Sequence, residues 1–148
     1  MTTRVLESPH DQEMAAKLIM AQSLPCTVEI RPGKVRSSKQ NKLQRKWISE
    51  IAEQLDDRTA EEWRGYCKLH YGVAILKAGS DLFREEYDKT IKPLPYEMKL
   101  KLMMEPFDFG VTRKMNSKQK KEYLDTIYRE FSGMGVELTD PDGFMEGR

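Results

Sequence analysis

Residues 31–55, RPGKVRSSKQNKLQRKWISEIAEQL, hold both the clearest helical pattern of the chain and its densest positive charge. From Ser38, a typical N-cap residue, to about Leu55, apolar side chains recur at the spacing of an α-helix. At 100° per residue, one face carries Leu43, Trp47, Ile48, Ile51 and Leu55. The stretch therefore predicts an amphipathic helix with one side packed into a core.

Residues 31–46 form a basic run that contains no acidic side chain. Its cations are Arg31, Lys34, Arg36, Lys39, Lys42, Arg45 and Lys46. The whole chain has 25 basic and 24 acidic residues, so the run is a local concentration of charge. Cations at a helix start oppose the helix dipole, whereas the amides there attract anions. The run predicts an anion-binding site, and the alternative is a solvated face.

A second basic run, residues 113–121, also lies across an expected helix start, at Asn116 or Ser117. Its cations are Arg113, Lys114, Lys118, Lys120 and Lys121. Two basic helix starts could frame one groove or face each other across a dimer. A solvated face is again the alternative.

The rest of the chain predicts short strands between helices. Strands are expected at residues 3–6, 27–31, 107–112 and 136–138, and residues 73–76 fit either a strand or the end of a helix. Helices are expected at residues 11–21, 81–90 and 96–104, and also after the Thr59–Glu62 capping box and across 117–133. Gly72 is expected to end the helix that follows Thr59, or to come soon after its end. We expect an α/β fold of the α+β type, with a small sheet packed against amphipathic helices. It would form a single domain over residues 1–139, with a flexible tail at 140–148.

Composition narrows the class of protein. The chain has 148 residues, of which 39% are hydrophobic and 33% charged, enough for one modest core. Neither a signal peptide nor a membrane-spanning run is recognisable, and Cys26 and Cys67 form no disulfide pattern. We expect a cytoplasmic protein without a cofactor or a membrane contact. Because the net charge is only +1, any nucleic-acid binding must come from a local patch.

Several single residues leave two interpretations open. Gln40 lies on the Trp47 side of its helix, where its amide either satisfies backbone groups or contacts a base. Trp47 and Trp63 lie on apolar faces, which favours the core over base stacking. Cys67 and His70 are three residues apart, and a satisfied core pair is favoured over half of a metal site.

Acidic residues gather around the turn after the first long helix. They are Glu50, Glu53, Asp56, Asp57, Glu61 and Glu62. A magnesium-dependent nuclease would need such carboxylates to converge on a phosphate. Glu61 and Glu62 instead suit the start of a helix, so we expect no catalytic residue and no metal ligand.

Residues 36–41 read R-S-x-x-Q-N, with Trp47 beyond them, and residues 59–63 read T-A-E-E-W. Weaker similarity continues through V-T-R-x-M at 111–115, Gly135-Val136 and Asp140-Pro141. Together these elements resemble the phage NinB family, also called Orf, of homologous-recombination proteins. The resemblance implies an α/β homodimer that binds single-stranded or gapped DNA. It also implies contact with a bacterial single-strand-binding protein and help in loading a recombinase or annealing protein.

We therefore predict a DNA-binding site built on the two basic helix starts. The predicted DNA-binding residues are Arg36, Ser37, Lys39, Asn41, Lys42, Arg45, Lys46, Arg113, Lys114 and Lys118. Two other functions stay open at this point. One is a structure-selective, magnesium-dependent phage nuclease. The other is an adaptor whose basic patch grips the acidic tail of a single-strand-binding protein.

Overall fold

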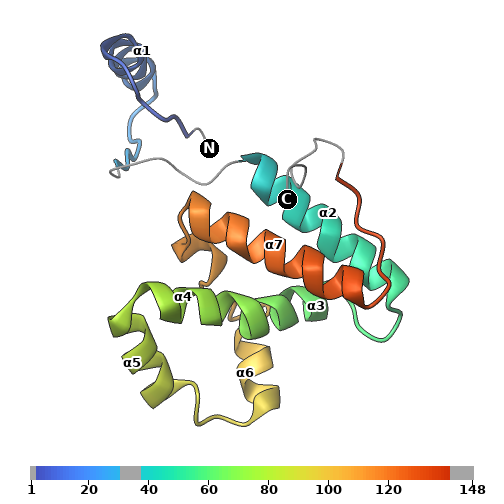
Figure 1. The fold of residues 1–148 in the computed structure, drawn as a ribbon. Helices are drawn as coiled ribbons and strands as arrows, with labels where there is room; N and C mark the ends of the chain where they lie inside the picture. The colour runs from blue at the N-terminus through green and yellow to red at the C-terminus, as the bar shows by residue number, and fades with distance from the viewer. Residues whose placement is uncertain (1–2, 31–37, 141–148) are drawn as a thin grey trace. The chain divides into compact units, whose positions relative to one another are not determined.

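The computed structural model describes residues 3–30 and 38–140 (Figure 1). It divides the chain into two compact units, Met1–Val35 and Arg36–Arg148. Within the residues described, all regular elements are helices and no strand forms. The prediction of an α/β fold with a small sheet is therefore wrong.

In the first unit, the described residues contain helix α1 (Pro9–Met20). Ser8 caps it by accepting a hydrogen bond from the Asp11 amide, and no residue of α1 is buried. The helix expected at 11–21 is thus confirmed with a slightly earlier start. The strands expected at 3–6 and 27–30 are wrong, and Arg31 lies outside the described residues.

The second unit carries the remaining helices. In chain order they are α2 (Ser38–Gln54), α3 (Ala60–Cys67), the π-helix η1 (Lys68–Gly72), α4 (Val73–Gly79), α5 (Asp81–Thr90), α6 (Tyr96–Leu102), the 3₁₀-helix η2 (Thr112–Lys114) and α7 (Ser117–Gly133). Figure 1 shows α2 and α7 side by side and running in the same direction. The rod formed by α3, η1 and α4 packs against both of them.

Three helix starts follow from side-chain caps that are visible in the sequence. The Thr59 hydroxyl accepts from the Glu62 amide while the Glu62 carboxylate accepts from the Thr59 amide, which forms the expected capping box. Ser80 caps α5 in the expected way, since its hydroxyl accepts from the Phe83 amide. Asn116 caps α7. These starts are confirmed because capping depends on residues only three apart in sequence.

Gly72 does not end the helix that begins after Thr59. Its backbone is right-handed helical, and the chain passes through η1 into α4 without a break. A Cβ at this position would lie 2.5 Å from the Val111 Cγ1 and 3.4 Å from the Tyr123 ring. The glycine therefore allows close packing between the rod and the segment before α7. Its role concerns packing and not chain termination, so the predicted helix end is wrong and residues 73–76 are helical.

We expect Gly72→Ala to destabilise the protein by roughly 1–2 kcal/mol. The added methyl group overpacks the contact with Val111, which outweighs the gain in helix propensity of about 1 kcal/mol. Gly133→Ala is the matched control because a Cβ there would meet nothing within 4 Å. Chemical denaturation of both variants checks this result, and equal stabilities would contradict the packing role of Gly72.

The expected closing strand at 136–138 is an extended segment held by side chains of α2. The Gln54 amide nitrogen donates to the Glu137 carbonyl at 2.8 Å, and the Gln54 oxygen accepts from the Glu137 amide at 2.8 Å. The Thr139 amide donates to the Glu50 carboxylate at 3.0 Å, and the Trp47 indole donates to the Thr139 carbonyl at 2.6 Å. Helix side chains thus replace a partner strand, which is why the strand prediction is wrong.

The expected strand at 107–112 is also wrong, because this segment follows an irregular path between α6 and η2. Asp108 has a positive φ of 46°, which a strand does not allow. Val111 is buried against the helices, so burial alone accounts for its apolar character. Phe109 and Val111 thus mark contact with the core and not pairing in a sheet, whereas Phe107 is exposed.

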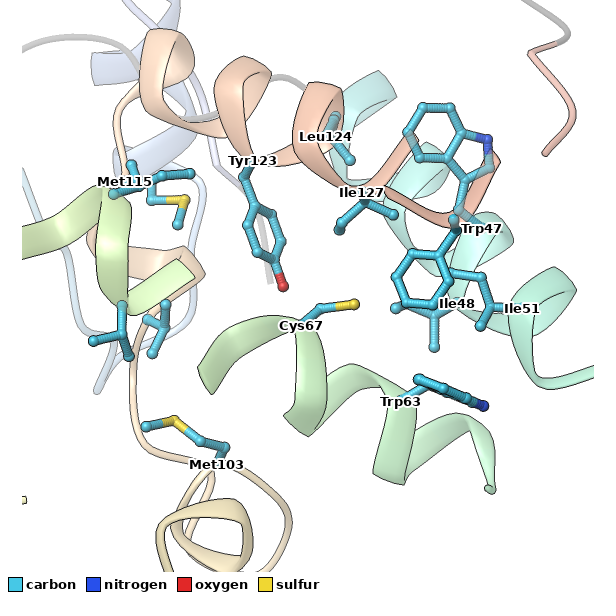
Figure 2. Packing of buried hydrophobic residues seen from close by; sticks show 14 of the residues in the cluster. Trp47, Ile48, Ile51, Trp63, Cys67, Met103, Met115, Tyr123, Leu124 and Ile127 are labelled. Carbon is cyan, nitrogen blue, oxygen red and sulfur yellow. The ribbon is translucent and has the colours of Figure 1, made fainter. Parts of the chain in front are cut away.

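The core lies where α2, α3 and α7 meet (Figure 2). Trp47 and Ile51 come from α2, Trp63 from α3, and Tyr123 and Ile127 from α7. Both indoles are buried and donate to backbone carbonyls, of Thr139 for Trp47 and of Leu55 for Trp63. The prediction that both tryptophans belong to the core is confirmed, so neither is available to stack on a base.

Candidate nucleic-acid interface

The structure brings the starts of α2 and α7 together. The Gln40 amide nitrogen donates to the Ser117 carbonyl at 3.1 Å. One turn further on, the Lys120 ammonium donates to the Gln44 side-chain oxygen. Because the two helices run in the same direction, their positive dipole ends lie side by side. The sequence left open whether the two basic helix starts frame one groove or face each other across a dimer. These contacts place both starts at one end of the α2–α7 pair within a single chain.

Most of the predicted DNA-binding cations are exposed at these helix starts. Arg36 and Ser37 lie outside the described residues, and Asn41 is partly exposed. Seven of the predicted cations are exposed: Lys39, Lys42, Arg45 and Lys46 on α2, Arg113 and Lys114 on η2, and Lys118 on α7. Together with Lys121, an exposed cation of the second basic run that was not among the predicted DNA-binding residues, they form what we call the basic surface. No acidic residue occurs in 38–49 or 113–121. The basic surface therefore carries concentrated charge that no carboxylate within these two segments neutralises.

Neither helix carries an acidic residue in its own first turn. The first turns of α2 and α7 both lack Asp and Glu, whereas α3 and α5 have them. Parallel helices with adjacent N-termini place like poles together, and lysines add to that repulsion. An anion bound at this end would relieve the repulsion from both sources.

Lys120 differs from the other cations of its run. Only 1% of its surface is exposed, and its ammonium lies 5.5 Å from the centre of the Tyr123 ring as well as bonding to Gln44. Its charge is therefore used inside the protein to join α7 to α2. The sequence does not distinguish it from Lys121, which is exposed.

Gln40 has the structural role that was one of its two interpretations. The side chain is buried, and its amide satisfies the Ser117 carbonyl at the first residue of α7. It links the two helix starts across 77 positions of sequence. A base contact is thus not needed to explain why a glutamine stands on the apolar side of α2.

A partly buried ion network in the second unit was not anticipated from the sequence. The Lys68 ammonium, with its side chain 3% exposed, donates to the Asp108 carboxylate and to the Met103 carbonyl, both at 2.7 Å. Arg64 donates to the same carboxylate oxygen at 2.7 Å and also pairs with Glu61. Lys68 and Arg64 hold the pKa of the Asp108 carboxyl at about 2, below its ordinary value. Burial lowers the pKa of the Lys68 ammonium, and its bond to Asp108 opposes that effect.

We expect Asp108→Asn to cost about 1 kcal/mol of stability at neutral pH and almost nothing near pH 2. Asparagine tolerates the positive φ at this position, so the change removes the charge and keeps the backbone. The folded-state pKa is lowered, so the carboxylate stabilises the fold above pH 4 and this contribution is lost as pH falls toward 2. The expected loss of stability is only about 1 kcal/mol because 39% of the Asp108 side chain is exposed, so water screens its ion pairs. Denaturation curves at both pH values check it, and a constant difference would contradict it.

The remaining polar candidates are dispersed. Cys67 is buried, which raises the pKa of its thiol, whereas His70 is exposed and pairs with the Tyr96 hydroxyl at 2.8 Å. The core-pair prediction thus holds for the cysteine and is wrong for the histidine. Glu50 binds the Thr139 backbone, and Glu62 caps α3. Among the described residues, no three His, Cys, Asp or Glu side chains form a group that could hold a metal ion.

No protein-family model matches the chain, and neither a curated protein nor a solved structure is significantly similar to it. The resemblance to the NinB family therefore rests on its own residues, and the α/β fold that it implied is not the fold observed. In the part of the chain that the structure covers, no helix is both long and apolar enough to cross a membrane.

Proposed function

We propose that this protein binds single-stranded or gapped DNA through the basic surface and acts as a recombination mediator. The observation that carries the proposal is the pairing of two basic helix starts at one end of α2 and α7. The two helix starts come from distant parts of the chain, each carries exposed cations, and neither contributing segment contains an acidic residue. Such a surface suits an extended polyanion better than a small anion.

The binding chemistry is that of a phosphate backbone. Lysine and arginine side chains neutralise phosphates and release condensed counterions, which supplies affinity without reading sequence. Asn41 and the amides at the helix starts add uncharged donors for phosphate oxygens. The proposed complex therefore has little base-sequence specificity and depends strongly on salt.

The role in recombination rests on the resemblance at 36–41 and 59–63. In this proposal the protein helps to load a recombinase or annealing protein onto single-stranded DNA. It also contacts a single-strand-binding protein. The homodimer and the cytoplasm of a bacterial host as the compartment belong to the same proposal. None of these roles depends on the phosphate contacts. Each can be disproved while the DNA-binding proposal still holds.

Fluorescence anisotropy with single-stranded, gapped and duplex DNA over a series of salt concentrations tests the proposal. For single strands we expect log affinity to fall against log salt with a slope of about −3 to −5, which corresponds to several phosphates neutralised by the basic surface. A shallow slope would contradict the phosphate clamp. Tight binding of an acidic peptide in place of DNA would favour the adaptor, which draws on the same cations.

A further inference from the structure

A hollow adjoins the basic surface between the end of α4, the start of α5 and the start of α7. Its volume is about 550 Å³. The residues that matter to its chemistry are Leu82, Phe83, Glu86, Lys114, Asn116 and Gln119. Lys114 belongs to both the hollow and the basic surface, and Asn116 is the N-cap of α7. The hollow thus continues the basic surface on the α4 side of the α7 start.

One wall of the hollow is an apolar platform that is fixed in advance. The Phe83 ring stacks on Tyr87, with the ring centres 5.7 Å apart and the planes at 25°, and it also lies near Phe109. Tyr87 is buried, so it holds the partly exposed Phe83 ring in place. Leu82 lines the same hollow with 70% of its surface exposed. Because Leu82 is so exposed and lies beside a fixed aromatic ring, it is suited to cover a flat ligand.

The part of the hollow that η2 and the start of α7 form offers hydrogen-bond donors. The capping box of α7 uses the side-chain oxygen of Asn116 and that of Gln119 as acceptors for backbone amides. Each side chain therefore keeps its NH₂ group as a donor. The Lys114 ammonium is a third donor, and the Glu86 carboxylate, on α5 with Leu82 and Phe83, is an acceptor. This set matches the carbonyl and ring-nitrogen acceptors and the amino donors along the edge of a nucleobase.

We propose that this hollow takes an unpaired nucleobase from the strand whose phosphates bind the basic surface. The inference rests on the proposed function and adds a site for the base to a site for the backbone. A base in a duplex presents neither its face nor its pairing edge, so only an unpaired base fits between the platform and the donors. A preference for single-stranded over duplex DNA follows from this hollow, because the phosphate contacts alone do not provide one.

The test compares oligothymidylate with an abasic strand of the same length, both measured by anisotropy at one low salt concentration. We expect the intact protein to bind the base-bearing strand about tenfold tighter, as one stacked base provides. Leu82→Ala should bring this ratio close to one and leave binding of the abasic strand unchanged. Met98→Ala is the matched control, since Met98 is a similarly exposed apolar residue on α6 outside the hollow.

Each outcome separates the two proposals. Equal affinity of the intact protein for both strands would overturn the base site and leave the phosphate clamp standing. A tenfold ratio that persists in Leu82→Ala would show that the base binds elsewhere. If neither strand binds, the proposed function fails and the base site fails with it.

Discussion

Replacing Lys39, Lys42 and Lys46 with glutamate should abolish DNA binding and leave the protein folded. All three side chains are exposed on the outward face of α2, so no core contact is lost. The change removes three phosphate contacts and adds repulsion, and we expect affinity to fall by more than about 100-fold at low salt. Stability should be unchanged or slightly higher, because glutamate near a helix start complements the dipole. Anisotropy with single-stranded DNA and a thermal melt measure the two effects.

The matched control is the triple change of Lys89, Lys92 and Lys101 to glutamate. These lysines are exposed on α5, after it and on α6, and the net charge changes by the same amount. We expect this variant to keep most of its affinity. Equal losses in both triple variants would show that net charge matters and the basic surface does not, whereas unfolding of the first would show that its lysines are structural.

Lys120→Ala should destabilise the protein by about 3 kcal/mol, the largest stability effect that we expect from a single lysine. The change leaves a cavity between α7 and α2 and removes the donor to the Gln44 oxygen. Lys121→Ala is the neighbouring control, since that side chain is exposed, and it should change stability by less than about 0.5 kcal/mol. Chemical denaturation of the two variants provides the comparison.

The same pair of variants separates structure from binding. Lys121→Ala should weaken DNA binding modestly through the loss of one phosphate contact. Lys120→Ala, measured at a temperature where it is folded, should bind DNA with nearly unchanged affinity because its ammonium faces Gln44. A variant at Lys120 that stays fully stable and binds DNA poorly would place this lysine on the binding surface.

Local signals in the sequence are sufficient to place three of the helix starts. Thr59, Ser80 and Asn116 each act on a backbone amide three residues away, and their caps form as expected. The apolar period of residues 38–55 also identifies Trp47 as a core residue. The basic surface was predicted from charge alone, except that Lys120 cannot be told from Lys121 without knowledge of what packs on α7.

The errors concern contacts between distant residues. An alternating stretch at 136–138 resembles a strand, yet its backbone bonds to the side chain of Gln54, 83 positions away. Gly72 looks like a helix end because the sequence does not reveal that Val111 packs against it. The joining of the two basic starts likewise depends on Gln40 meeting Ser117. None of these contacts has a local pattern, so the fold class was wrong although most helix starts were right.

The extended segment held by α2 has a spacing that matches the helix. Glu50 and Gln54 are four residues apart, a rise of about 6 Å along a helix, and they bind Thr139 and Glu137, about 7 Å apart in an extended chain. A one-residue insertion between Glu137 and Thr139 would break this match, because every later backbone group would point the wrong way. We therefore expect the segment to tolerate a change of side chain at Glu137, whose backbone makes the bonds, but not a change in its length.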